Sequence, residues 1–328
     1  MRLFLVRHGE TVDNVAGIYA GSRDSPLTAH GVLQARRLGA HLASQSAAIG
    51  PVRHVFASDL KRAVETAKVV IDAQTTAAVS SSHGRTQPAT SGLDSESDPV
   101  RVNGGDKDVE SDRVAELAEP LKLVELPELR ERDFGSAEGK KFGVDLAHSG
   151  AESREQMRQR VERFVETHLA PLLTIEQVTL GGSIVIVSHG LILGVLLGVL
   201  LARYGGGQMA FLGGPKTPWW SNTGYYELVV DAVSSSSATA GSGPASPGNS
   251  TGVSGERTPR LNLPTPPSRR PRIALSVIGI NVLKHLEGLK KTRGGIGSTQ
   301  FDKRQRTVDS FFTPMAKKAK VEPAPERV

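Results

Sequence analysis

Short apolar runs alternate with helical repeats along the first part of the chain. Residues 3–6 and 53–57 are the first two runs, and each has the length of a buried strand. Between them, apolar side chains recur at helical spacing after Thr28, a suitable N-cap: Val32, Ala35, Leu38 and Leu42. A second helical repeat follows the second run: Leu60, Ala63, Ala67 and Val70. This alternation predicts an α/β fold whose parallel sheet is covered on both faces.

The same pattern resumes further along the chain. Order resumes near residues 121–126, and a long amphipathic helix follows: Met157, Val161, Phe164, Val165 and Leu172. Residues 183–202 are almost continuously apolar and have the length of a membrane span. Glycines interrupt this stretch and His189 lies within it, so a buried strand followed by a buried helix explains it better, and we expect no membrane insertion.

Two low-complexity segments divide the ordered pattern. Residues 74–116 and 234–270 are rich in Ser, Gly, Thr, Asp or Pro, so we predict disordered insertions there. Residues 225–230 and 273–280 predict two neighbouring strands on either side of the second insertion. The expected architecture is a three-layer α/β/α domain over residues 1–293 with a mostly parallel central sheet. A disordered basic tail is predicted for residues 294–328.

Charge and composition narrow the chemistry. The 328-residue chain has a formal net charge of +6, and residues 284–328 account for it with eleven basic and five acidic side chains. The absence of cysteine excludes disulfides, thiolate metal sites and a cysteine nucleophile. The apolar run at residues 3–6 is too short for the core of a signal peptide, so we expect a cytoplasmic or nuclear protein.

Residues that suit phosphate chemistry follow the predicted strands. Arg7 and His8 end the first strand, where open α/β sheets place their ligands. Neutral imidazole is a competent nucleophile, and the adjacent guanidinium offers planar donors to phosphate oxygens. Arg62 lies in the first turn of a helix, and His189 ends another strand. Considered alone, Arg62 could be a solvated helix residue and His189 could be a structural histidine. Together with Arg7 and His8, they predict a pocket for a phosphoryl group.

The motifs resemble those of the histidine phosphatase superfamily, which is also called phosphoglycerate mutase-like. Five segments carry the resemblance in the same order: residues 5–11, 24–28, 31–35, 58–63 and 188–190. The resemblance implies that His8 is phosphorylated and that Arg7, Arg62 and His189 neutralise the transferring oxygens. Asn14 and the Gly190 backbone would assist. It implies no metal and no cofactor.

The loop at residues 129–139 is similar to the family's acid-bearing loop. Matching it residue by residue places the proton donor at Glu131, with Glu138 as the alternative. A surface carboxylate remains the competing interpretation for Glu131, since most charged side chains are exposed.

A closer resemblance to one branch of the superfamily predicts the substrate. Residues 129–140, 222–224 and 281–293 are similar to the fructose-2,6-bisphosphatase type, in particular the glycolysis-and-apoptosis-regulator branch. The longer segment that mutases carry after the acid loop has no match, which favours hydrolysis of a small phosphorylated metabolite over mutase activity. Arg23, Lys140 and Arg203 are candidates for a second phosphate and equally fit ordinary surface charges.

The tail carries a second candidate function. Four of its residues are spaced as in the peptide that docks on the replication sliding clamp: Gln305, Val308, Phe311 and Phe312. Flanking basic residues suit an acidic clamp surface and a nuclear-import signal. Alternatively, the two phenylalanines anchor the tail on the catalytic domain. Direct nucleic-acid binding is not expected, because no aromatic-rich groove accompanies the charge.

Two hypotheses follow. The chain is a phosphoric monoester hydrolase, or it is a clamp- or chromatin-associated interaction protein built on a phosphatase fold. A scaffold has no need of the full chemical set, so its presence favours the enzyme: Arg7, His8, Arg62, Glu131 and His189.

Overall fold

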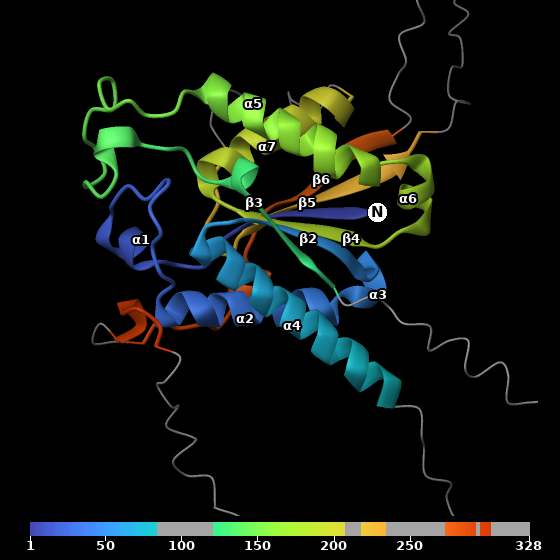
Figure 1. Ribbon diagram of the computed structural model, residues 1–328. Helices are drawn as coiled ribbons and strands as arrows, with labels where there is room; N and C mark the ends of the chain where they lie inside the picture. The colour runs from blue at the N-terminus through green and yellow to red at the C-terminus, as the bar shows by residue number, and fades with distance from the viewer. Residues whose placement is uncertain (84–120, 207–217, 234–272, 293–295, 303–328) are drawn as a thin grey trace, which may run out of the picture.

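The chain folds around a six-stranded mixed sheet with helices on both faces (Figure 1). A computed structural model describes residues 1–83, 121–206, 218–233, 273–292 and 296–302. The strand order is β3-β2-β4-β1-β5-β6. The strands are β1 (Arg2–Arg7), β2 (Val52–Ser58), β3 (Leu123–Leu126), β4 (Ser183–Ser188), β5 (Tyr225–Ala232) and β6 (Ile273–Val282).

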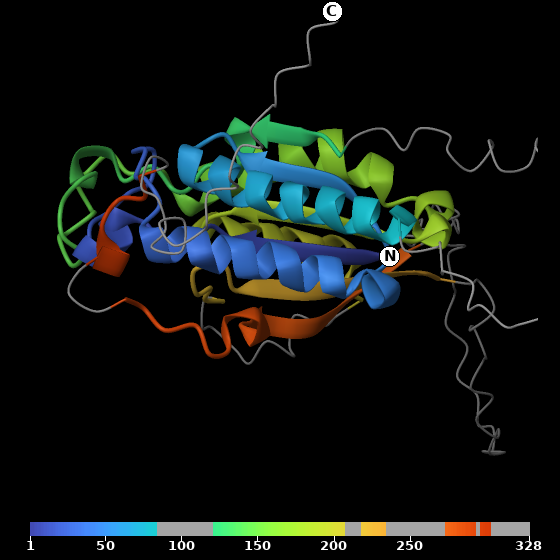
Figure 2. The same ribbon diagram turned by 90° about the horizontal axis from the view of Figure 1, so that it is seen from below.

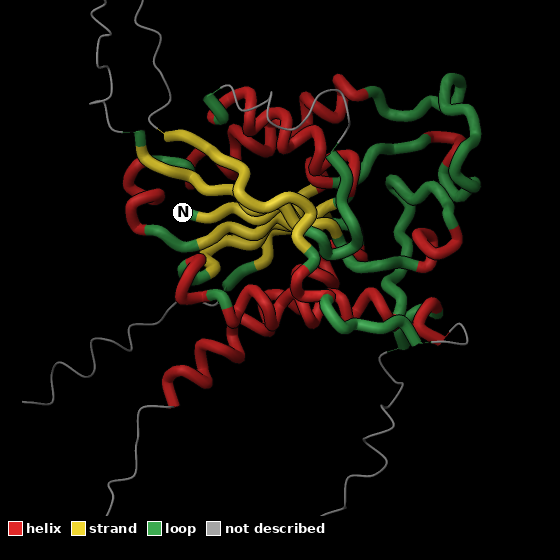
Figure 3. The backbone as a smooth tube through the Cα atoms, turned by 180° about the vertical axis from the view of Figure 1, so that it is seen from behind, coloured by secondary structure: helices red, strands yellow, loops and turns green. Residues whose placement is uncertain are grey.

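The sheet is mostly parallel, as predicted. Strands β3, β2, β4 and β1 pair in parallel, whereas β5 runs antiparallel to both β1 and β6. The two strands at residues 225–230 and 273–280 are therefore neighbours, as expected. Because the four parallel strands point the same way, their carboxyl ends meet at one edge, where loops gather (Figure 3).

Helices form the outer layers: α1 (Val12–Ala16), α2 (Ala29–Ser44), α3 (Ser46–Ile49), α4 (Lys61–His83), α5 (Arg154–Phe164), α6 (Ile175–Leu180) and α7 (Gly190–Tyr204). Helices α5 and α7 cover one face of the sheet, and α2 and α4 cover the other (Figures 1 and 2). Short 3₁₀ turns are Pro127–Leu129, Gly135–Ala137, Ala170–Leu172, Lys284–Leu286 and Ile296–Ser298, and Val165–Leu169 is a π turn.

The two faces of β1 explain why its apolar run is unbroken. Leu3 and Leu5 belong to the core beneath α5 and α7, whereas Phe4 and Val6 belong to the core beneath α2 and α4. A strand buried on both faces needs apolar residues at every position rather than at alternate ones.

The long apolar stretch divides into β4 and α7, as predicted. All six residues of β4 are buried, and α7 packs against α5 and the sheet. Among the described residues, no helix combines the length and the apolar character needed to cross a bilayer.

Three boundary predictions need correction. Helix α4 continues to His83, so the first insertion does not begin at residue 74. The helix predicted through Leu172 ends as α5 at Phe164 and continues as the π turn and a 3₁₀ turn that contains Pro171, which lacks the amide that a continuous helix needs. Residues 296–302 are not a free tail.

Residues 296–302 pack on the start of α2. The Ala29 amide donates to the Thr299 carbonyl at 3.0 Å, and the Phe301 amide donates to the Leu27 carbonyl at 3.0 Å. Thr28 and Gln300 form an antiparallel bridge between these bonds. The catalytic domain therefore extends past residue 293. Residues 84–116, 234–270 and the clamp-like peptide at 305–312 lie outside the described residues.

We expect truncation after Gly295 to lower the free energy of unfolding by about 1–3 kcal/mol, because the Ala29 amide loses its partner at the helix start. Truncation after Asp302 is the matched control and should leave stability unchanged. Urea unfolding of both proteins measures the difference. Equal midpoints would contradict a structural role for this segment.

Candidate active site

The register between β1 and β4 brings two histidines together. Arg7 pairs with Ser188. His8 and His189 directly follow these two residues and therefore lie side by side. The His8 amide donates to the Ser188 carbonyl at 2.9 Å. The two rings meet edge to face with centroids 5.0 Å apart. Strand pairing thus places both predicted histidines in one buried pocket.

A backbone contact selects the tautomer of His8. Its Nδ1 lies 2.7 Å from the Gly9 carbonyl oxygen, which can only accept, so Nδ1 carries the proton. The other ring nitrogen, Nε2, therefore holds the free lone pair. Burial is the main cause that holds the His8 pKa well below its usual 6.5, and the positive charges of Arg62 and Arg7 lower it further. The ring is neutral and nucleophilic at physiological pH.

His189 has the opposite tautomer. The Arg62 Nε–H donates to His189 Nδ1 at 3.1 Å, which leaves the proton on Nε2. Burial, followed by the charge of Arg62, holds the His189 pKa well below 6.5. One imidazole thus offers a lone pair and its neighbour offers an N–H donor, which suits a nucleophile beside an oxygen-binding group.

Most of the Arg62 guanidinium is used inside the protein. It donates to the carbonyls of Ala20, Gly21 and Arg23 at 2.6–3.0 Å, in addition to His189. Burial lowers the Arg62 pKa to about 10, with nearby carboxylates, Glu131 foremost, opposing the shift. The side chain is charged at physiological pH. Beyond the predicted contact with phosphate, Arg62 orients His189 and ties down the loop that follows α1.

Two buried donors in the lining of the cavity have no hydrogen-bond partner among the described residues. Arg7 donates through Nη1 to the Trp220 carbonyl at 2.7 Å, but its Nε–H has no acceptor, and neither does His189 Nε2–H. An unsatisfied buried donor costs about 1–3 kcal/mol. A phosphoryl oxygen in the pocket would satisfy both.

Glu131 lies at the start of α7. Its carboxylate accepts from the amides of Arg132 at 2.9 Å, Leu191 at 3.1 Å and Ile192 at 3.1 Å. These bonds hold the acid against the same helix end that begins beside His189. Among the described residues that line the cavity at His8, Glu131 alone has a carboxylate.

Glu138, the alternative acid, has a different position. It accepts from the amides of Gly21, Ser22 and Phe134 at 3.0–3.1 Å and does not line the cavity. A Cβ on Gly21 would collide with both the Arg132 backbone and this carboxylate. Glu138 therefore joins the acid loop to the loop after α1, and Glu131 is the better candidate.

Asn14 and Gly190 also line the cavity. Asn14 caps α1 through Thr11, and its Oδ1 accepts from Asn222 Nδ2 at 3.0 Å. Its Nδ2 makes no hydrogen bond within the described residues, so this donor can meet a phosphoryl oxygen. All seven predicted site residues thus surround one cavity.

Comparison with known proteins agrees with this geometry. The model of the histidine phosphatase superfamily (branch 1) matches residues 3–83 and 111–212, which is more than half of the chain. The chain belongs to this superfamily. It is 31% identical to a probable phosphoglycerate mutase of Yersinia enterocolitica over 201 residues, which cover 61% of this chain and 75% of that protein.

Two further proteins are similar to this histidine phosphatase. It is 25% identical to a probable phosphatase of Schizosaccharomyces pombe over 327 residues, covering 95% of this chain and 79% of that one. A solved structure titled mycobacterial hydrolase 1 shares the fold, with a TM-score of 0.50 and 17% identity over 86% of this chain and 98% of the other. The predicted phosphoglycerate mutase-like fold is confirmed.

The turn at residues 222–224, which the sequence linked only to substrate preference, supports the end of β1. The Thr223 amide donates to the carbonyls of Arg7 at 3.0 Å and His8 at 3.2 Å, and Asn222 Nδ2 donates to the His8 carbonyl at 3.2 Å. Thr223 has φ +56°, a costly conformation for a β-branched residue. Its hydroxyl accepts from His285 Nε2 at 3.0 Å. The strained turn therefore fixes the end of β1 through the carbonyls of Arg7 and His8.

The cavity has a volume of about 520 Å³. The sequence did not predict its shape. Beyond the phosphoryl-binding end, most of its lining is apolar: Ile18, Tyr19, Phe134, Phe142, Leu146, Leu191, Pro218, Trp219 and Trp220. The adjacent tryptophans are the only two in the chain and were the available signal.

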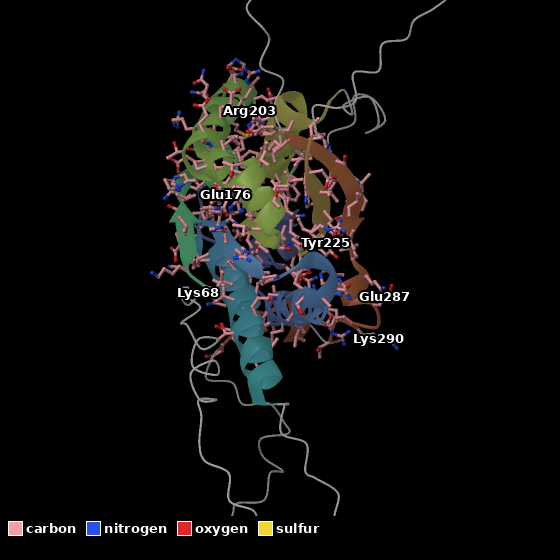
Figure 4. All side chains as sticks on the ribbon, turned by 90° about the vertical axis from the view of Figure 1, so that its right-hand side faces the viewer. Lys68, Glu176, Arg203, Tyr225, Glu287 and Lys290 are labelled. Atoms are coloured by element: carbon pink, nitrogen blue, oxygen red, sulfur yellow. The ribbon has the colours of Figure 1, made fainter. Side chains whose placement is uncertain are left out.

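The candidates for a second phosphate lie elsewhere. None of Arg23, Lys140 and Arg203 lines the cavity. Arg23 pairs with Asp13 at 3.1 Å, and Arg203 pairs with Glu166 at 3.8 Å. Arg203 lies near the far end of α7 from Gly190, on the side of the molecule shown in Figure 4. These three residues are surface charges.

The buried histidines predict how stability depends on pH. Burial lowers the His285 pKa to about 4, and those of His8 and His189 also lie below 6.5. Below pH 6.5 the unfolded chain binds protons that the native state does not, so the free energy of unfolding should fall from pH 6.5 towards 4. His285→Asn should remove about 1–2 kcal/mol of the loss between pH 7.5 and 5, measured by urea unfolding. The exposed His148→Asn is the control; identical pH profiles for the two variants would contradict this account.

Proposed function

We propose that the protein is a metal-independent phosphatase that hydrolyses phosphomonoesters through phosphorylated His8. The observation that carries this proposal is the pairing of tautomers. His8 presents a lone pair on Nε2, and the neighbouring His189 presents a buried proton on Nε2. Arg7 and Arg62 add two positive charges to the same cavity.

In the first step, His8 Nε2 attacks phosphorus and the ester P–O bond breaks. The phosphoryl group leaves the substrate for the ring, and the departing oxygen takes a proton from Glu131. Arg7 and His189 stabilise charge on the transferring oxygens, because both retain donors that the folded protein does not use.

In the second step, water attacks the same phosphorus and the P–N bond breaks. Glu131 takes the proton from water and regains the form that begins the cycle. Inorganic phosphate leaves, and His8 returns to its neutral state, which the low pKa of this buried ring favours. The two steps use no group outside the cavity.

Hydrolysis is favoured over mutase activity by the short segment after the acid loop. Phosphoglycerate mutase activity remains the alternative, since one relative is named a probable phosphoglycerate mutase and another a probable phosphatase. Fructose-2,6-bisphosphate is a weaker candidate than the sequence resemblance suggests, because Arg23, Lys140 and Arg203 lie outside the cavity. A substrate with one phosphate fits better.

We expect a ³²P-labelled substrate to leave acid-labile, base-stable label on the protein in rapidly quenched mixtures. His8→Ala should abolish both label and turnover. Glu131→Gln should lower kcat by about 10²–10⁴ for alkyl phosphates, whose leaving oxygen needs a proton, and by less for 4-nitrophenyl phosphate. The exposed Glu125→Gln is the control and should match the parent protein.

Persisting turnover in His8→Ala would overturn the mechanism. An equal effect of Glu131→Gln on both leaving groups would remove Glu131 as the acid. Excess chelator should not change the rate, and loss of activity that a divalent metal restores would contradict a metal-independent reaction.

We also propose, from spacing alone, that the peptide at residues 305–312 binds a sliding clamp. Titration calorimetry of the full chain against the clamp should show binding that Phe311→Ala/Phe312→Ala weakens at least about tenfold, since such aromatic anchors typically contribute 2 kcal/mol or more. Lys317→Ala is the control for general charge. Equal binding by all three proteins would remove this proposal.

A further inference from the structure

Three aromatic rings form one wall of the cavity. Tyr19 lies between Phe134 and Phe142, with ring centroids 4.6 Å and 5.0 Å away. Phe142 is 57% exposed and Trp219 is 66% exposed, although both line the cavity. Large aromatic side chains left open to solvent beside a reaction centre often indicate a binding surface.

Backbone hydrogen bonds hold this wall in place. The Tyr19 amide donates to the Lys140 carbonyl, the Gly139 amide donates to the Tyr19 carbonyl, and the Phe142 amide donates to the Gly17 carbonyl, all at 2.9 Å. Ile18 and Lys141 form an antiparallel bridge within the same ladder. The rings are therefore positioned before substrate binds, which reduces the entropy lost on binding.

Polar groups are scarce beyond the phosphoryl-binding end. Thr11 Oγ1 accepts from the Asn14 amide, Tyr19 Oη accepts from the Gly143 amide at 3.4 Å, and Trp220 Nε1 donates to the Leu5 carbonyl. Arg132 is the one charged side chain among the described residues of that region, and its Nε donates to the Glu152 carbonyl. A sugar would place several hydroxyls against this surface, and each hydroxyl left unpaired costs about 1–3 kcal/mol.

We infer that the group esterified to phosphate is aromatic, and that it stacks on the wall formed by Tyr19, Phe134 and Phe142, beside Trp219. This inference rests on the proposed function, because it places the phosphate at His8. The cavity volume of about 520 Å³ suits a small molecule. The substrate class is thus a small aryl or arylalkyl phosphomonoester.

Matched pairs of substrates test this class without confusing it with leaving-group reactivity. Both 2-naphthyl and phenyl phosphate release a phenol-type oxygen, and both benzyl phosphate and glucose 6-phosphate release a primary alcohol. We expect KM for the naphthyl ester to be about tenfold lower than for the phenyl ester, because the second ring buries more apolar area. We expect kcat/KM for benzyl phosphate to exceed that for glucose 6-phosphate by about a hundredfold, for the unpaired hydroxyls described above.

Phe142→Ala should raise KM for 2-naphthyl phosphate by about tenfold and change kcat much less, because stacking contributes to binding rather than to bond cleavage. Ile280→Ala is the control, since Ile280 is similarly exposed but lies outside the cavity. A thermal melt of both variants shows whether either has lost its fold. Preference for the sugar phosphate, or an unchanged KM in Phe142→Ala, would overturn the inference and leave the phosphatase proposal intact.

A binding measurement separates the two proposals. Both tryptophans of the chain line the cavity, so quenching of their fluorescence in His8→Ala reports binding without turnover. If no ester is hydrolysed by the parent protein, the proposed function falls. Tighter binding of the naphthyl than the phenyl ester then supports the aromatic wall, and equal binding overturns it. Higher kcat/KM for a tyrosine-phosphorylated peptide than for 2-naphthyl phosphate would overturn the small-molecule class.

Discussion

The parallel pairing of β1 with β4 is the constraint on which the site depends. Arg7 is opposite Ser188, and a histidine follows each of these two residues. The pairing therefore brings the two rings into contact. A shift of one residue would turn one ring to the other face of the sheet. The register itself is maintained by two hydrophobic cores, since each face of β1 packs against a different pair of helices.

Arg62 connects this strand pair to the loops around the cavity. One guanidinium orients His189 and also holds the carbonyls of Ala20, Gly21 and Arg23. Glu138 holds the amides of the same loop from the other side. The acid loop and the loop after α1 are thereby joined, and their shared ladder presents the aromatic wall. The predicted site residues and the aromatic wall therefore depend on the same buried polar contacts.

His8 is also supported from the antiparallel edge of the sheet. The Asn222–Thr223 turn precedes β5 and donates to the carbonyls of Arg7 and His8. Thr223 retains a strained backbone because its amide and its hydroxyl are both engaged, the latter with His285. Strain of this kind persists where neighbouring contacts over-determine a conformation, and such places are often functional.

The sequence by itself determined the layered α/β class and predicted the residues that surround the cavity. Unbroken apolar strands and helical repeats depend on burial, and the motifs at Arg7, Arg62 and His189 follow those elements directly. Tertiary structure decided what depends on contacts between distant segments. Glu131 and Glu138 are distinguished by the amides that each meets and by the cavity, which Glu131 lines and Glu138 does not, and residues 296–302 are held by the start of α2. The aromatic wall joins residues 19, 134 and 142, and no local pattern predicts that such separated rings share one cavity.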